Sequence, residues 1–317
     1  VNINIPPLEY LFSFYKKILK SERLYGKLKL MRKRFQKSQG GFLMKIKMIA
    51  TDIDGTLVTD DKRIMPRTVA ALKEARKRGI YVVLCSGRPV SGIQDYLTEL
   101  GLTENDDYAI TFNGAQAMNV GKHEVVFENG LTDKECIDFI KMADNCRIKS
   151  QVVTLNSEIY VTNQDISKYS VEDAFYTHMP LRYRRLEDLP TGMDAAKFMW
   201  VDQAEKIAAQ LDQIPEELYQ KYAIVRSAPW FLEFNNANAT KGHAVLELAA
   251  HLGIKPDEIM VAGDENNDLS MLEQIPFSVA MGNGNSHVKE VSSVVTEDNN
   301  HDGLGLAVEK YVLQRKV

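Results

Sequence analysis

Short apolar runs alternate with amphipathic segments along the chain from residue 44 onward. The first run, residues 46–50, is rich in apolar and β-branched residues and ends in Thr-Asp-Ile-Asp-Gly, which predicts a buried strand that stops in a polar turn. Residues 66–78 follow with apolar positions at helical spacing, a Pro in the first turn and Gly79 after the last, which predicts a helix. A second apolar run at 80–85 completes a strand–helix–strand unit, so we expect a parallel sheet.

The pattern changes between residues 115 and 230, where short strand-like runs follow one another. Adjacent strands with helices set apart are typical of an α+β layer, so we expect a separate domain inserted here, with joins at Asn113-Gly114 and near Asn235-Asn236. The expected strands are 125–127, 151–155, 158–161, 197–201 and 222–225, and the expected helices are 132–146 and 203–213.

The last part of the chain returns to alternating helices and strands. Thr240 is a suitable N-cap for a helix that Gly253 ends, and the apolar run 259–262 stops at Gly263-Asp264. A helix at 268–274, a strand at 277–281 and a helix at 304–313 are expected to follow. The predicted fold is therefore α/β: a Rossmann-like parallel-sheet core formed by residues 44–114 and 231–317, with an inserted α+β cap at 115–230.

Residues 1–43 differ from the rest, with ten Lys or Arg against two Glu, a net charge of +8. Apolar residues alternate with these basic ones, as in a loosely amphipathic helix that could contact a membrane surface. The other interpretation is an extension that precedes a domain starting near Met44 and takes no part in the fold.

Composition narrows the class of protein. The whole chain of 317 residues has a net charge of −4, which gives no reason to expect nucleic acid as a partner. No apolar run reaches the length of about 18 residues that a membrane-spanning helix needs. Three cysteines without metal-type spacing fit reduced thiols in a cytoplasmic protein. The sequence predicts no particular oligomeric state.

Polar residues follow four predicted element ends, and in a parallel sheet such ends meet at one edge. Asp52 could attack a phosphorus atom, and Asp54 could move protons to and from the reacting oxygens. Attack by an anion on a phosphate requires positive charge, which Mg²⁺ and Lys241 would provide. Ser86 and the amide of Gly87 could bind phosphate oxygens, because glycine allows close backbone approach.

It is the order of the motifs that is specific. Asp-x-Asp-Gly-Thr-Leu, Ser-Gly-Arg, Asn-Gly-Ala, a lysine and Gly-Asp-x-x-Asn-Asp occur in turn, followed by Val-Ala-Met-Gly-Asn. This series resembles the haloacid dehalogenase superfamily of phosphatases, and the inserted domain resembles the large α/β cap of its Cof-type subfamily (type IIB). The resemblance covers the chain from about Met44 to its C-terminal end.

The resemblance implies a role for each matching residue. Asp52 would be the nucleophile and Asp54 the general acid and base. Mg²⁺ would be bound by Asp52, the main-chain carbonyl of Asp54 and Asp264. The phosphate would contact Ser86, Gly87, Lys241 and Asn267. Thr56 would support the metal ligands, and Asp268 would either support them or be an outer metal contact.

The expected function is a Mg²⁺-dependent phosphatase acting on small phosphorylated metabolites such as sugar phosphates, phosphorylated cofactors or nucleotides. Two alternatives remain: a phosphomutase, which would return the phosphoryl group to a second hydroxyl, and a regulator that binds phosphoesters without turnover. Selectivity is expected in the cap, where His178, Arg182 and Tyr183 could reach a substrate or lie in a solvated loop.

Overall fold

The computed structural model describes residues 45–314. The basic segment 1–43, and with it the predicted amphipathic helix, lies outside the described residues. Within 45–314, no helix is both long enough and apolar enough to cross a bilayer.

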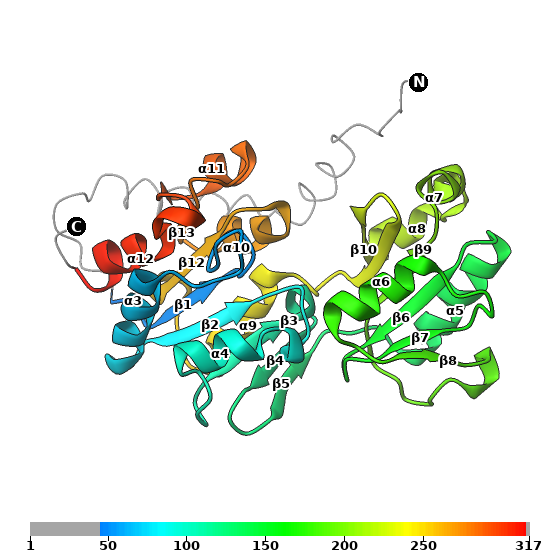
Figure 1. Cartoon of the computed structure of the whole chain (residues 1–317), viewed down its shortest axis with the longest axis horizontal. Coiled ribbons are helices and arrows are strands. Elements are labelled where there is room, and N and C mark those ends of the chain that lie inside the picture. Colours follow the sequence, from blue (N-terminus) through cyan, green and yellow to red (C-terminus); the bar gives the residue numbers. More distant parts are fainter. Residues whose placement is uncertain (1–44, 315–317) are drawn as a thin grey trace.

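One half of the molecule is built on an eight-stranded sheet with the order β14-β13-β12-β1-β2-β3-β4-β5 (Figure 1). The strands from β14 to β3 run parallel, as predicted, and β4 and β5 add an antiparallel edge. The strands are β1 (Met48–Thr51), β2 (Tyr81–Cys85), β3 (Tyr108–Thr111), β4 (Gln116–Asn119), β5 (Glu124–Glu128), β12 (Ile259–Gly263), β13 (Phe277–Ala280) and β14 (Val294–Val295).

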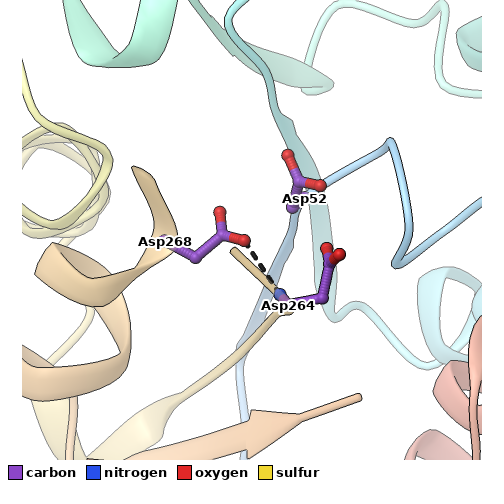
Figure 2. A group of neighbouring side chains, drawn as sticks. All are labelled: Asp52, Asp264 and Asp268. Carbon is purple, nitrogen blue, oxygen red and sulfur yellow. Dashed lines mark hydrogen bonds between the residues drawn. The ribbon is translucent and has the colours of Figure 1, made fainter. Parts of the chain in front are cut away.

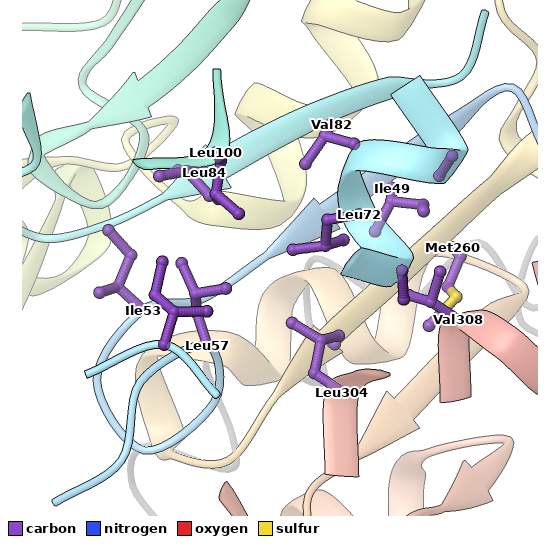
Figure 3. Packing of buried hydrophobic residues seen from close by; sticks show 14 of the residues in the cluster. Ile49, Ile53, Leu57, Leu72, Val82, Leu84, Leu100, Met260, Leu304 and Val308 are labelled. Atoms are coloured by element: carbon purple, nitrogen blue, oxygen red, sulfur yellow. The ribbon is translucent and has the colours of Figure 1, made fainter. Parts of the chain in front are cut away.

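Helices cover both faces of this core sheet because alternate strand residues point to opposite sides. Ile49 packs on the face covered by α3 (Pro66–Lys77), α4 (Gln94–Leu100) and α12 (Gly303–Ala307). Figure 3 shows this packing, with Ile49 in the same cluster as Leu72 and Leu304. Its neighbours in β1, Met48 and Ala50, pack on the face covered by α9 (Lys241–His251), α10 (Leu269–Gln274) and α11 (Ser286–Val291). A strand buried on both faces explains why β1 reads as a continuous apolar run.

The cap is built on a six-stranded sheet with the order β10-β11-β9-β6-β7-β8. One face is covered by α5 (Asp133–Asn145), α7 (Ala204–Gln210) and α8 (Glu216–Lys221), and the other by α6 (Lys168–Thr177). The strands are β6 (Ser150–Thr154), β7 (Ile159–Val161), β8 (Leu181–Tyr183), β9 (Ala195–Val201), β10 (Tyr222–Ala228) and β11 (Phe231–Asn236).

The predicted cap boundaries at residues 115 and 230 need correction. β4 and β5 pair with the core sheet, so the strand expected at 125–127 belongs to the core. β11 pairs with β9 and β10 in the cap sheet, so the chain returns to the core only after Asn236. A strand pattern shows that a segment is extended but not which sheet it joins, which is why both boundaries were misplaced.

The two chain crossings between core and cap, after β5 and after β11, touch each other, because Asn236 Nδ2 donates to the backbone oxygen of Gly130 at 3.0 Å. The second crossing also lies against the core at Gly114. Gly114 has φ +102°, and a Cβ there would lie 2.4 Å from the backbone oxygen of Thr240. Phe112 and Ala115 from the core and Ala239 from the second crossing pack against the cap strands in one apolar cluster, here called the hinge cluster. This cluster joins the α6 face of the cap sheet to the core.

Candidate active site

Three carboxylates meet at the C-terminal ends of β1 and β12 (Figure 2). Asp52 follows β1 directly, and Asp264 and Asp268 lie in the loop after β12. Each is buried, and each offers an oxygen within 4.8 Å of the others. The parallel pairing of β1 with β12 brings together residues that lie far apart in sequence.

Lys241 supplies the positive charge of this cluster. It is the first residue of α9, whose N-cap Thr240 accepts a hydrogen bond from the amide of His243, as predicted. Its fully buried Nζ donates to Asp52 Oδ1 and, at 2.7 Å, to Asp268 Oδ1. Burial alone would lower the pKa of Lys241, but Asp268 and Asp52 outweigh it and hold the pKa above its usual value. Lys241 is therefore a charged group inside the protein.

Asp268 holds the loop after β12 in place. Its Oδ2 accepts from the backbone amides of Asp264 at 2.9 Å and Glu265 at 3.0 Å, while its Oδ1 accepts from Lys241. A Cβ at Gly263 would lie 2.5 Å from Asp268, so this approach needs glycine. Both oxygens of Asp268 are engaged, which favours the predicted supporting role.

Thr56 orients the carboxylate of Asp264 by donating to its Oδ1 at 2.8 Å. Gly55 contacts the same side chain. Its φ is +80°, and a Cβ at this position would lie 2.3 Å from Asp264 Oδ2, which leaves no space for a side chain. Burial raises the pKa of Asp264 to about 6, although the Thr56 hydrogen bond acts in the opposite direction. Burial also raises the pKa of Asp52, in spite of its contact with Lys241.

Asp54 is held by two cations to which sequence reasoning assigned no role. Arg88 donates through Nε at 3.0 Å and through Nη2 at 2.6 Å, and Lys62 Nζ donates at 2.7 Å. Burial alone would raise the pKa of Asp54, but these two cations outweigh it and hold the pKa below its usual value. Arg88 belongs to the Ser-Gly-Arg motif, so the sequence contained a signal that could have identified it as a site residue. Nothing in the sequence pattern indicated a role for Lys62.

The predicted phosphate-binding residues lie on neighbouring loops. Ser86 follows β2 and accepts from the amide of Arg88 at 3.1 Å. Asn267 follows β12 and donates to Asn113 Oδ1 at 3.3 Å, and a Cβ at Gly87 would lie 3.0 Å from the Asn113 side chain. Asn113, noted in the sequence as a join between domains and as the start of the Asn-Gly-Ala motif, thus bridges two of these loops.

The donor set fits a hard divalent cation. Three buried carboxylates lie together, and Lys241 is the cation that pairs with two of them, Asp52 and Asp268. Mg²⁺ prefers carboxylate oxygens. Because the Asp268 oxygens already accept three hydrogen bonds, Asp52 and Asp264 are the side chains best suited to bind it.

We expect Mg²⁺ to stabilise the protein more at pH 8 than at pH 5. A carboxyl whose pKa is raised from 3.8 to about 6, as for Asp264, stabilises the fold below pH 4 and loses this contribution as the pH rises through 6. Mg²⁺ binds only the ionised form, so its affinity rises by up to about tenfold per pH unit for each proton released. Thermal unfolding with and without Mg²⁺ across this range measures the effect.

Asp264→Asn is the control for this titration, because the variant has one fewer proton to release and should show a flatter dependence. A Mg²⁺-induced shift in Tm that stays constant or shrinks from pH 5 to pH 8 would contradict the assignment of Asp52 and Asp264 as ligands.

An α/β core with acidic strand ends and a separate cap is the architecture of a capped hydrolase. The family model described as haloacid dehalogenase-like hydrolase matches residues 49–308, and the chain belongs to this family. A Bacillus subtilis protein named "Putative phosphatase YxeH" is 36% identical over 85% of this chain and 99% of its own length.

Two further relatives agree with this. The B. subtilis 5-amino-6-(5-phospho-D-ribitylamino)uracil phosphatase YcsE is 27% identical over 84% of this chain and 96% of its own. A solved structure of a HAD subclass IIB sugar phosphatase is 27% identical with a TM-score of 0.64, covering 84% of this chain and 98% of that one. The protein is therefore a phosphatase of the haloacid dehalogenase-like family, which confirms the predicted class of enzyme.

Proposed function

We propose that this phosphatase hydrolyses small phosphorylated metabolites in a Mg²⁺-dependent reaction through an aspartyl-phosphate on Asp52. The observation that carries the proposal is the buried contact of Asp52 with Lys241 beside Asp264, at the C-terminal edge of the parallel sheet. A carboxylate in that position can act as a nucleophile once its charge, and that of the phosphate, is balanced.

In the first step, an Asp52 oxygen bonds to phosphorus and the bond from phosphorus to the ester oxygen breaks. Asp54 gives its proton to the leaving oxygen. In the second step, water attacks phosphorus and passes a proton to Asp54. The bond between phosphorus and the Asp52 oxygen breaks, so inorganic phosphate and the free carboxylate are restored.

The other residues bind and orient. Lys241 holds Asp52 in place and offsets negative charge, and Ser86, the Gly87 amide and Asn267 are proposed to bind the phosphate oxygens. Mg²⁺, held by Asp52, Asp264 and the main-chain carbonyl of Asp54, would supply positive charge that favours attack on an anionic phosphate.

The ion pairs of Asp54 bear on its two roles. Arg88 and Lys62 favour the ionised carboxylate, which is the form that accepts a proton from water in the second step. The first step needs protonated Asp54, so these ion pairs have to loosen before the leaving oxygen can receive its proton.

The organic part of the substrate is proposed to contact α6. Figure 1 shows α6 along the side of the cap sheet nearer to the core, the side joined to the core by the hinge cluster. Val171, Phe175 and Tyr176 are exposed on this helix, the two rings by 72% and 79%. This apolar surface supports substrates with an aromatic group as well as the sugar phosphates named for the subclass IIB relative.

The proposed location is the cytoplasm, which the three free cysteines support. Arg182, considered for substrate contact, lies in β8 rather than in a loop and forms an ion pair with Glu158 at 2.8 Å.

The test is release of inorganic phosphate from p-nitrophenyl phosphate and from a panel of sugar phosphates, nucleotides and phosphorylated aromatic cofactors, with Mg²⁺ or with EDTA. We expect turnover with Mg²⁺ and none with EDTA. An isomeric phosphate ester in place of inorganic phosphate would identify a mutase. Thermal stabilisation by these compounds without turnover would identify a binding protein.

A further inference from the structure

Asn283 lies between β13 and α11, where it meets two loops of the candidate active site. Its Nδ2 donates to the backbone oxygen of Gly55 at 2.8 Å and lies 3.4 Å from Asp264 Oδ2. Its Oδ1 accepts from the backbone amide of Asn299 at 3.1 Å. The side chain is exposed, yet both ends of its amide have partners, which fixes its orientation.

Asn299 continues this chain of hydrogen bonds. Its buried side chain donates to the backbone oxygen of Val58 at 3.0 Å and to Asp60 Oδ1 at 3.1 Å. Val58 and Asp60 belong to the loop of residues 58–64, here called the flap, which also carries Lys62. Asn283 and Asn299 therefore join the loop after β13 to both the Gly55 turn and the flap.

These hydrogen bonds orient the residues that are suited to bind a cation. Asp264 lies between Thr56, which donates to Oδ1, and Asn283, which approaches Oδ2, so its carboxylate is oriented from two sides. Gly55 has a positive φ, and its carbonyl is held by Asn283. The peptide that precedes this carbonyl contains the Asp54 oxygen, so fixing Gly55 limits where that oxygen can point.

We propose that Asn283 is a positioning residue of the cation site, which orients Asp264 and the Gly55 turn, and that Asn299 keeps Asn283 in place. The proposal rests on the proposed Mg²⁺-dependent function and adds residues to it. Groups that hydrogen-bond to metal ligands raise metal affinity by holding the ligands in a binding geometry before the ion arrives. In the sequence, Asn283 was noted only as the last residue of the Val-Ala-Met-Gly-Asn motif, and the resemblance assigned no role to it.

The test is Mg²⁺ binding to the full chain by isothermal titration calorimetry, without substrate, for the wild type and Asn283→Ala. We expect about 10- to 100-fold weaker binding by the variant. Because the side chain is exposed, its removal leaves no buried cavity, and Tm without Mg²⁺ should stay at the wild-type value. At saturating Mg²⁺, the KM for p-nitrophenyl phosphate should equal that of the wild type.

Two further variants make the result specific. Asn299→Ala should weaken Mg²⁺ binding in the same direction, and the double variant should bind about as weakly as Asn283→Ala alone, since two residues acting as one unit are not additive. Asn300→Ala is the matched control: Asn300 is exposed and hydrogen-bonds Asp60 in the flap, and its removal should leave Mg²⁺ affinity unchanged.

Wild-type Mg²⁺ affinity in Asn283→Ala would overturn the inference. A raised KM with unchanged Mg²⁺ affinity would also overturn it and would place Asn283 on the substrate instead. If the wild type itself binds no Mg²⁺, the proposed metal dependence fails and the inference fails with it; the wild-type titration identifies that case by itself.

Discussion

Asp52→Asn is expected to lower kcat by at least about 10⁴-fold, corresponding to more than about 5 kcal/mol of transition-state stabilisation. The amide has nearly the shape of the carboxylate and can still accept from Lys241, but it lacks the charged oxygen that bonds to phosphorus. The measurement is phosphate release under saturating Mg²⁺, together with a rapid-quench search for phosphorylated protein in the first turnover.

The fold must be shown to survive this substitution. Asn removes the buried charge of a side chain whose pKa burial already raises, so Tm should not fall. Asp54→Asn is the companion variant: it keeps the nucleophile, so phosphorylated protein should still form from substrates with a good leaving group. Wild-type turnover by Asp52→Asn would show that another group attacks the phosphorus.

Lys241→Met is expected to reduce the free energy of unfolding by about 3–5 kcal/mol, because removing one partner leaves buried charges without compensation. Asp52 and Asp268 would lose the cation that contacts both of them. For a chain of this size, the loss corresponds to a fall in Tm on the order of 10 °C. Since Mg²⁺ supplies positive charge at the same carboxylates, adding it should recover part of the loss.

The cap offers a matched control. Lys197 is also largely buried and pairs with Glu233 at 2.9 Å, far along the chain from the carboxylate cluster. Lys197→Met should lower Tm as well, but Mg²⁺ should stabilise it no more than it stabilises the wild type. Equal recovery of the two lysine variants by Mg²⁺ would disprove a cation site at Asp52 and Asp264.

Much of the core could be predicted from local patterns. Pro66 at the start and Gly79 after the end delimited α3 to within a residue or two, and Thr240 caps α9 as expected. These signals act within one helical turn, so they do not depend on the rest of the fold. The same holds for the acidic residues at the ends of β1 and β12, which are marked by the glycines beside them.

The cap was predicted less well. The sequence indicated α6 only as a helix-like stretch before His178, without bounds, because its exposed apolar residues Val171, Phe175 and Tyr176 blur the helical pattern. β11 was missed as well: its inward Leu232 and Phe234 alternate with Glu233, whose charge is compensated by Lys197 from the neighbouring strand. Such compensation cannot be recognised without knowing the partner.

The sequence by itself determined the α/β class, the parallel core, the inserted domain and the motifs that carry the candidate chemistry. Only the tertiary structure decided which groups contact these motifs. Arg88 hydrogen-bonds to Asp54, Thr56 to Asp264 and Asn283 to Gly55, and the partners are separated in sequence by 34, 208 and 228 positions. The physical reason is the distance along the chain over which each kind of signal acts. Strand and helix signals depend on neighbours in sequence, whereas a hydrogen bond between loops depends on the sheet order that brings those loops together.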